Sequence, residues 1–193
     1  MAPQMMSQLV LPQAFFDRKP LVTAAGETLT VEDRFQLIEL VHRFEWSYGA
    51  LNREALFDLL TDDVIIDHGM GYAQGKEEMI ALGVPSYGLR HLFANHVLFV
   101  DEQGRANIIA HMLVIQVVSE QPVSAALPTI LDQGVNRYVF RKEGGNWKIA
   151  EMTFDQQKLA DYLGAPEALH RSMGQTATER AREQGRTNGT SKK

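Results

Sequence analysis

Apolar residues recur at helical spacing in the stretch TLTVEDRFQLIELVHRFEWSYGAL. They follow one another at intervals of four, three and four residues, as Leu37, Val41, Phe44 and Tyr48. This spacing places them on one face of a single helix. Thr30 is suited to cap that helix, because Asp33 follows three residues later and a carboxylate is favoured at the positive N-terminal end. Gly49 weakens the helix near its end.

Shorter runs predict the elements that follow. Two short helices are expected in REALFDLL and GKEEMIALG, and a strand is expected in DDVIIDHG, which leads into a glycine turn. Four β-rich runs fill the second half of the chain: HLFANHVLFV, RANIIAHMLVIQVV, GVNRYVFRK and NWKIAEMTFD. The turn signals DEQG and EGGN divide these runs into two hairpins. Between the hairpins, PVSAALPTILDQ predicts a loop or an irregular edge.

The order of these elements predicts an α+β fold. Two helices, a strand and a helix precede four long antiparallel strands, so we expect helices on one face of a curved sheet. The lack of strand–helix alternation and of a glycine-rich phosphate loop argues against Rossmann and P-loop folds. One domain is expected over residues 29–163, with an N-terminal arm (1–28) before it. A C-terminal helix and a disordered basic tail (164–193) are expected after it.

Composition narrows the function classes. The chain has 193 residues, 45% of them hydrophobic, which is enough for one core. It has no cysteine, which excludes disulfides, thiolate metal ligands and cysteine nucleophiles. The net charge is −5, although the last 23 residues hold six Lys or Arg and two Asp or Glu, so nucleic-acid binding is not expected of the acidic body. No apolar run reaches the roughly 20 residues that span a bilayer and no secretory signal is recognised, so we expect a cytoplasmic protein without membrane contact.

Four stretches together resemble the SnoaL-like branch of the nuclear-transport-factor-2-like (NTF2-like) superfamily: ALFDLLTDDVIIDHG, GKEEMI, RHLFANHVLFVD and NRYVFRKEGGNWKIAEM. The resemblance covers about residues 30–157. It implies a cone-shaped α+β barrel in which a curved antiparallel sheet and helices enclose one deep pocket. It also implies a homo-oligomer, either a dimer or a trimer. The superfamily hosts dehydratases, isomerases, cyclases, epoxide hydrolases and non-enzymes, so the fold alone does not define an activity.

The segments FEWSYGALN and IDHG are similar to those of the scytalone dehydratases. On this likeness, Tyr48 and His68 fall on tyrosines that polarise the substrate carbonyl. His91 falls on the catalytic histidine, which dehydrochlorinases and bile-acid dehydratases also have, and Asn136 falls on an asparagine of the pocket. Those enzymes pair the histidine with an aspartate on the first helix, where this chain has Gly49.

Elimination of water beside a carbonyl needs a base of near-neutral pKa and hydrogen-bond donors for the forming enolate oxygen. Histidine suits the first task, and a neighbouring carboxylate fixes its tautomer. Glu45 lies one turn before Gly49 at the edge of the apolar helix face, so it is a candidate for the missing acid. Asp67, the other candidate, is expected to face away from the site. We therefore predict a His91–Glu45 pair.

Side chains alternate between the two faces of a strand, so the residues from His91 to His96 are divided between two faces. His91 and Phe93 share one face, and His96 is expected on the other. The hairpin around DEQG brings His111 close to Phe93, and we expect His111 on the same face as His91, as a second proton-transfer group. The expected apolar walls of the substrate site are Phe44, Ile66, Phe93, Leu113, Ile115 and Val117.

Taken with the family resemblance, these residues favour a cofactor-independent lyase or isomerase of dehydratase type. Its substrate would be hydrophobic and cyclic, of polyketide, steroid or terpenoid type. His91 would be the base, assisted by His111 or Glu45, and the substrate would be polarised by Tyr48, His68 and Asn136. No metal is expected, because the histidines at 68, 91 and 111 lack the spacing of a zinc motif.

Two other interpretations stay open at this point. One is a non-catalytic protein that binds small molecules, for which the missing aspartate at Gly49 argues. The other is another enzyme of the same fold, such as a polyketide-type cyclase. An epoxide hydrolase is less favoured, because the sequence offers no inward Asp-Arg-Asp set. Each candidate also has a purely structural interpretation, such as a buried strand histidine for His91 and a core aromatic for Tyr48.

Overall fold

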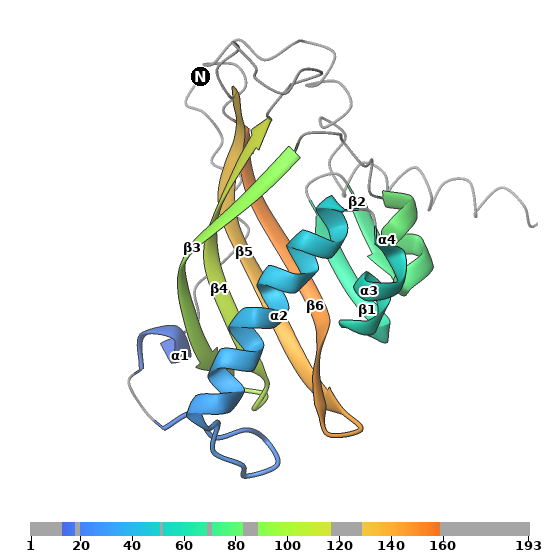
Figure 1. The fold of residues 1–193 in the computed structure, drawn as a ribbon. Coiled ribbons are helices and arrows are strands. Elements are labelled where there is room, and N and C mark those ends of the chain that lie inside the picture. The colour runs from blue at the N-terminus through green and yellow to red at the C-terminus, as the bar shows by residue number, and fades with distance from the viewer. Residues whose placement is uncertain are drawn as a thin grey trace, which may run out of the picture.

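The computed structural model describes residues 13–17, 20–50, 52–68, 71–82, 89–116 and 129–158. In these ranges, one six-stranded sheet is accompanied by four helices (Figure 1). The helices are α1 (Gln13–Phe16), α2 (Val31–Gly49), α3 (Arg53–Asp58) and α4 (Lys76–Leu82). The strands are β1 (Leu60–His68), β2 (Gly71–Gln74), β3 (Leu89–Val100), β4 (Ala106–Gln116), β5 (Thr129–Glu143) and β6 (Asn146–Lys158).

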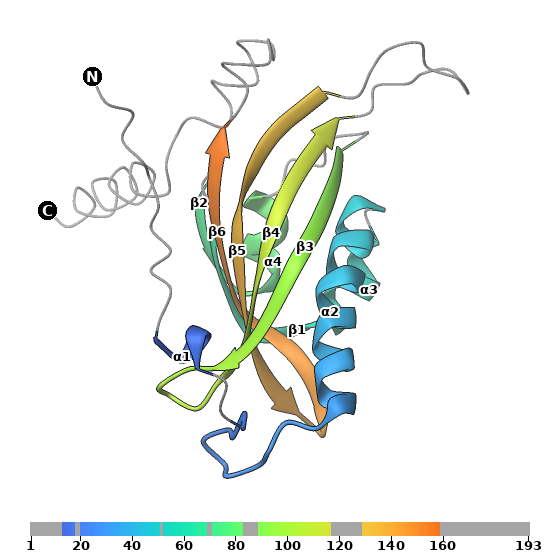
Figure 2. The same ribbon diagram turned by 90° about the vertical axis from the view of Figure 1, so that its left-hand side faces the viewer.

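The strands lie in the order β2-β1-β6-β5-β4-β3. Neighbouring strands run antiparallel, except that β1 runs parallel to β6. The sheet is curved, and strands β2 and β3 are its two edges (Figure 2). The predicted α+β class and the four long antiparallel strands are confirmed. The sequence pattern did not predict β2, which is short and partly polar. It also did not predict the parallel pairing of β1 with β6, which joins segments far apart in the chain.

Helix α2 begins as its capping residues predict. Thr30 Oγ1 accepts a hydrogen bond from the Asp33 backbone N–H at 3.0 Å, and Asp33 Oδ2 accepts one from the Thr30 N–H at 2.9 Å. The other carboxylate oxygen, Asp33 Oδ1, accepts a hydrogen bond from the Trp147 indole N–H at 2.7 Å. One aspartate therefore caps α2 and also ties the start of the helix to β6.

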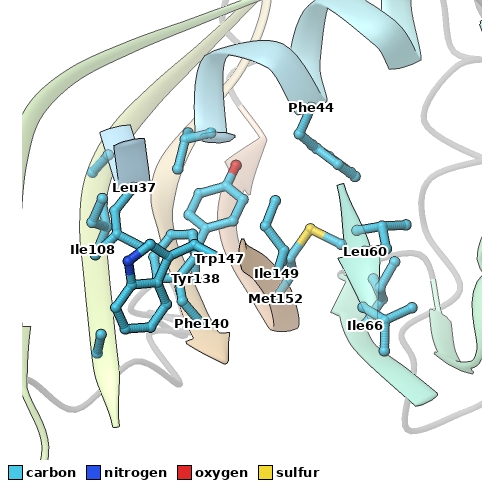
Figure 3. Close-up of a cluster of buried hydrophobic side chains, with 14 of the residues drawn as sticks. Leu37, Phe44, Leu60, Ile66, Ile108, Tyr138, Phe140, Trp147, Ile149 and Met152 are labelled. Atoms are coloured by element: carbon cyan, nitrogen blue, oxygen red, sulfur yellow. The ribbon is translucent and has the colours of Figure 1, made fainter. Parts of the chain in front are cut away.

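Helix α2 lies along one face of the sheet, which we call the inner face (Figures 1 and 2). The predicted helix positions Leu37, Val41 and Phe44 are buried there. They join a cluster with sheet residues that include Leu60, Ile66, Ile108, Tyr138, Phe140, Ile149 and Met152 (Figure 3). Burial of each large apolar side chain stabilises the fold by about 1.5–3 kcal/mol. None of the helices in the described ranges has the length and apolar character needed to cross a membrane.

A β-bulge in β3 changes the expected alternation of side chains. Ala94 pairs with His111 and Val97 pairs with Ile109, so two residues of β3, Asn95 and His96, lie opposite one residue of β4. Asn95 adopts the left-handed conformation, with φ at 56°. The extra residue turns His96 toward α2, where its ring centroid is 5.1 Å from that of His42. The expectation that His96 faces away from the helix was therefore wrong.

Candidate active site

Three side chains from three elements meet on the inner face. Glu45 comes from α2, His91 from β3 and Tyr138 from β5. Glu45 Oε2 is 3.3 Å from His91 Nδ1, and the Tyr138 hydroxyl donates to Glu45 Oε1 at 3.2 Å. The side chains of Glu45 and His91 are only 10% and 19% exposed. The predicted contact between His91 and Glu45 is therefore present in the structure, and Tyr138 adds a third member.

Helix geometry explains why Glu45 reaches the sheet. Its side chain lies beside the buried face that Val41 and Phe44 occupy, so it points toward β3 rather than into solvent. Gly49, one turn later, leaves the position of the missing aspartate without a side chain. Apart from its chain neighbours and the backbone of α2 itself, nothing in the described residues lies within 4 Å of a Cβ built at Gly49. Glu45 therefore places a carboxyl group beside His91 from the preceding turn.

Burial sets the ionisation of the pair. It raises the pKa of Glu45 from 4.5 to about 8, and the hydrogen bond from Tyr138 opposes this rise. Burial also lowers the pKa of His91. Near neutral pH both groups therefore favour their uncharged forms, with a carboxylic acid beside a neutral imidazole.

Aromatic rings surround these polar groups. The Tyr138 ring centroid lies 6.5 Å from Phe44, 6.0 Å from Phe93 and 6.2 Å from Phe154. The Tyr48 ring lies 6.5 Å from the His91 ring, and burial raises the pKa of Tyr48, as does the nearby Glu45. Rings of this kind exclude water and present apolar surface to a ligand. Phe44 and Phe93, two of the expected wall residues, therefore pack around Tyr138 beside the Glu45 carboxyl.

Asn136 lies two residues before Tyr138 on β5 and is fully buried. Its Nδ2 donates to Met112 Sδ at 3.2 Å. Its Oδ1 is buried and has no hydrogen-bond partner within the described part of the chain. A buried acceptor without a partner is costly.

The strand register separates His111 from the site. His91 pairs with Val114 and Phe93 pairs with Met112, whereas His111 lies opposite Ala94, on the other face of the sheet. His111 is exposed, and its Nδ1 is 3.1 Å from Asn95 Nδ2. The expectation that His111 shares a face with His91 was therefore wrong by one residue of register.

Two other expected wall residues follow His111 onto this outer face. Leu113 pairs with Leu92, and Ile115 pairs with Arg90. Both are partly exposed, whereas Met112 and Val114, which alternate with them, are buried. The register places Met112 opposite Phe93 on the inner face, so Met112 and Val114 occupy the positions that the sequence assigned to Leu113 and Ile115.

The remaining expected site residues are Ile66, His68 and Val117. Ile66 is buried in the core cluster on β1 and pairs with Met152 (Figure 3). His68 ends β1, but the position of its side chain lies outside the described residues. Val117 also lies outside the described residues. In the part of the chain that is described, no three His, Asp or Glu side chains are grouped to hold a metal ion.

Two polar residues of the inner face, Tyr138 and Asp132, were not among the residues predicted from the sequence. Both are fully buried. Asp132 pairs with Val114, which in turn pairs with His91, so all three lie in one row across the sheet. The signal was present in the stretch DQGVNRY, where Asp132, Asn136 and Tyr138 fall at even spacing and therefore on one face of a strand.

Comparisons with known proteins agree with this architecture. Residues 29–153 match the family model of the SnoaL-like domain. A search of the curated proteins finds no match. Among solved structures, an NTF2-like protein with a cystatin-like fold from Novosphingobium aromaticivorans is 22% identical, with a TM-score of 0.54, over 74% of this chain and 89% of that one.

Two further structures are similar at lower identity. A protein from the same organism named "Putative Scytalone Dehydratase" is 16% identical, with a TM-score of 0.52, over 66% of this chain and 85% of that one. LinA is 16% identical, with a TM-score of 0.55, over 66% of this chain and 87% of that one. At such identities these structures establish a shared fold. Because the family model matches well over half of its length, this chain belongs to the SnoaL-like domain family.

Proposed function

We propose that this protein is a cofactor-independent lyase or isomerase that moves a proton beside the carbonyl group of a hydrophobic, cyclic substrate. His91 is the base, and Glu45 is its acid partner. The buried contact between Glu45 Oε2 and His91 Nδ1 at 3.3 Å carries this proposal. A carboxyl group at that nitrogen orients the imidazole and fixes its tautomer. The solved structure named as a scytalone dehydratase supports the reaction class.

The ionisation of Glu45 decides what His91 does. When Glu45 is a carboxylate, it accepts a hydrogen bond from Nδ1–H, and Nε2 has a free lone pair that can take a proton. When Glu45 is protonated, it donates to Nδ1, and Nε2 instead carries the hydrogen. The base form therefore requires loss of one proton from the pair, and burial places this loss near pH 8.

In the proposed elimination, every proton that is transferred passes through His91. Nε2 of His91 removes a proton from the carbon beside the substrate carbonyl, and the electron pair moves onto the carbonyl oxygen as an enolate. Tyr48, whose ring lies 6.5 Å from that of His91, donates a hydrogen bond to this oxygen. The enolate then expels the β-hydroxyl group, which takes the proton from His91 and leaves as water. The product is an enone, and His91 returns to its starting form.

One observation favours a second candidate, a binding protein without turnover. Because the pKa of Glu45 is about 8, most molecules at pH 7 have the protonated carboxyl, and His91 then presents an N–H donor. Such a donor, with Asn136 Oδ1 as an acceptor, suits a ligand that carries both a carbonyl and a hydroxyl group. The apolar surroundings suit the rest of such a ligand.

A panel of cyclic β-hydroxy ketones distinguishes the two candidates. Formation of the enone is followed by absorbance at pH 8 for wild type, His91→Ala, Tyr48→Phe and His111→Ala. The last variant is a matched control, because His111 lies on the outer face. We expect His91→Ala to lose at least a thousandfold of kcat/KM and Tyr48→Phe to lose roughly tenfold to a hundredfold. Turnover that survives in His91→Ala would falsify the base assignment, and binding without turnover in wild type would support the second candidate.

A further inference from the structure

Tyr138 occupies the centre of the inner face. It is fully buried in the middle of β5, and its ring points from the strand toward helix α2 (Figure 3). Phe44, Phe93 and Phe154 contact it from three other elements. A ring enclosed in this way has little freedom to rotate, so the position of its hydroxyl oxygen is fixed by packing. That oxygen lies 3.2 Å from Glu45 Oε1.

The Glu45 carboxyl has two different neighbours, one for each oxygen. Oε1 accepts a hydrogen bond from Tyr138, while Oε2 lies 3.3 Å from His91 Nδ1. The described titratable groups facing this carboxyl are Tyr48 from its own helix, His91 from β3 and Tyr138 from β5. Of these, Tyr138 contacts the oxygen that is turned away from His91.

We propose that Tyr138 is a positioning residue for the His91–Glu45 pair: its hydroxyl holds Oε1, so that Oε2 faces His91 and determines which imidazole nitrogen carries hydrogen. This inference rests on the proposed function, because it describes how that pair is set. Tyr138 acts through Glu45 and need not contact the substrate.

The hydrogen bond from Tyr138 has a consequence in each ionisation state. In the protonated carboxyl, an oxygen that accepts a hydrogen bond is best as the carbonyl oxygen, so the acidic hydrogen lies on Oε2 and points at His91 Nδ1. In the carboxylate, the same hydrogen bond stabilises the negative charge. Tyr138 therefore directs the proton to the correct oxygen and also makes its loss easier.

Removing only the hydroxyl tests this role in ligand-free protein. In Tyr138→Phe we expect the titration of Glu45, followed by its 13Cδ chemical shift, to move upward from about 8 by about one to two pH units. At pH 9, the 15N shifts of His91 should then report the tautomer with hydrogen on Nε2 instead of Nδ1. Tyr72→Phe is the matched control, because Tyr72 is 51% exposed on β2.

A second substitution gives the opposite sign and retains the ring and hydroxyl. Site-specific replacement of Tyr138 by 3-fluorotyrosine makes the hydroxyl a stronger donor, so the Glu45 titration should move downward. If Tyr138→Phe does not fold, the 3-fluorotyrosine variant tests the inference in its place. In a Glu45→Ala background, Tyr138→Phe should leave the His91 tautomer unchanged, because the carboxyl group through which Tyr138 acts is gone.

The inference is overturned if both Tyr138 replacements leave the Glu45 titration where it is in wild type. It is also overturned if Tyr138→Phe alters the His91 tautomer equally with and without Glu45. These measurements need no substrate, so they are separate from the test of the reaction. Loss of turnover in His91→Ala would stand even if the Tyr138 contact proved unimportant, and the converse also holds.

Discussion

At the scale of single residues, Glu45 links the proposed chemistry of the site to the stability of the fold. The carboxyl has a pKa of 4.5 when it is exposed, but burial raises this pKa to about 8 in the folded protein. Between these values the folded chain holds a proton that the unfolded chain has lost. The contribution of Glu45 to stability therefore falls as the pH rises from about 4.5 to about 8.

Glu45→Gln should remove this pH-dependent penalty. We expect the substitution to increase the free energy of unfolding at pH 8 by about 2–4 kcal/mol relative to its effect at pH 4.5. Urea unfolding at the two pH values measures the difference. Glu39→Gln is the control, because Glu39 lies on the exposed side of the same helix in an ion pair with Arg43. Equal effects of Glu45→Gln at both pH values would contradict a raised pKa for this carboxyl.

The same ionisation predicts the pH dependence of activity. In the proposed reaction the base form of His91 requires the Glu45 carboxylate, so kcat/KM of wild type should rise about tenfold per pH unit up to about pH 8 and then level off. In Glu45→Gln, this rise of kcat/KM with pH should disappear, since the amide does not titrate. Initial rates of enone formation from pH 5.5 to 9.5 give the profile. A rise at the same pH in the Gln variant would assign the titration to another group.

The partnership of Glu45 and His91 could be predicted because it depends on local rules. A helical turn fixes where Glu45 lies relative to Gly49. The stretch RHLFANHVLFVD, through its family resemblance, identified His91 as the histidine of the site. The face of His111 could not be predicted, because the bulge at Asn95 and the register of the hairpin depend on the packed sheet. Tyr138 was missed although its strand alternation was visible, because an aromatic residue at such a position is usually interpreted as core.

At the scale of elements, the start of α2 depends on Asp33. The Trp147 indole and the Thr30 backbone and hydroxyl groups, in that order, donate hydrogen bonds that hold the pKa of this carboxyl far below its usual value. A carboxylate with a lowered pKa contributes stability that is present above the unfolded pKa of 3.8 and is lost as the pH falls toward the folded value.

Asp33→Asn should therefore make unfolding less sensitive to acid. At pH 7 we expect the variant to be about 1–2 kcal/mol less stable than wild type, and the difference should shrink below pH 4. Thermal unfolding followed by circular dichroism at pH 7 and pH 3 checks this. Glu32→Gln, in the same first turn but outside the capping box, is the control. A gap between wild type and Asp33→Asn that stays constant down to pH 3 would speak against this account.

At the scale of the whole molecule, an ion network on the outer face joins the strands that carry the site. Asp101, at the turn after β3, contacts Arg105 Nε at 2.9 Å and Arg137 on β5 at 3.2 Å. Arg105 also contacts Glu151 on β6 at 2.6 Å. The Asp101 side chain is only 8% exposed, so its charge is poorly screened by solvent. The network thus fixes β3, β5 and β6 relative to one another.

Asp101→Asn should leave two arginines facing each other without their shared acid. We expect a loss of about 1–3 kcal/mol in the free energy of unfolding, measured from urea midpoints at low salt. Asp63→Asn is the matched control: its ion pair with Arg141 is exposed, so its loss should stay within about 0.5 kcal/mol. Similar losses for both variants would show that burial of the network contributes nothing.

The fold as a whole was more predictable than the site, for a physical reason. Hydrophobic periodicity and turn signals specify each element and the hairpin neighbours, and together these are enough to indicate an α+β sheet with a covering helix. The parallel pairing of β1 with β6 brings together residues that are 86 positions apart at Asp67 and Thr153, and no local pattern encodes it. A site is sensitive to one residue of register, whereas a fold class is not.

The open space at Gly49 bears on how the position of the acidic residue in such a site can change during evolution. Apart from its chain neighbours and the backbone of α2 itself, nothing in the described residues lies within 4 Å of a Cβ at this position, so a side chain can begin there without a clash. The double variant Gly49→Asp/Glu45→Gln should therefore recover at least tenfold of the kcat/KM lost in Glu45→Gln alone, and no recovery would mean that only the earlier turn can serve. If the double variant is active, the proposed acid partner of His91 can be gained at one position before it is lost at the other, without an inactive intermediate.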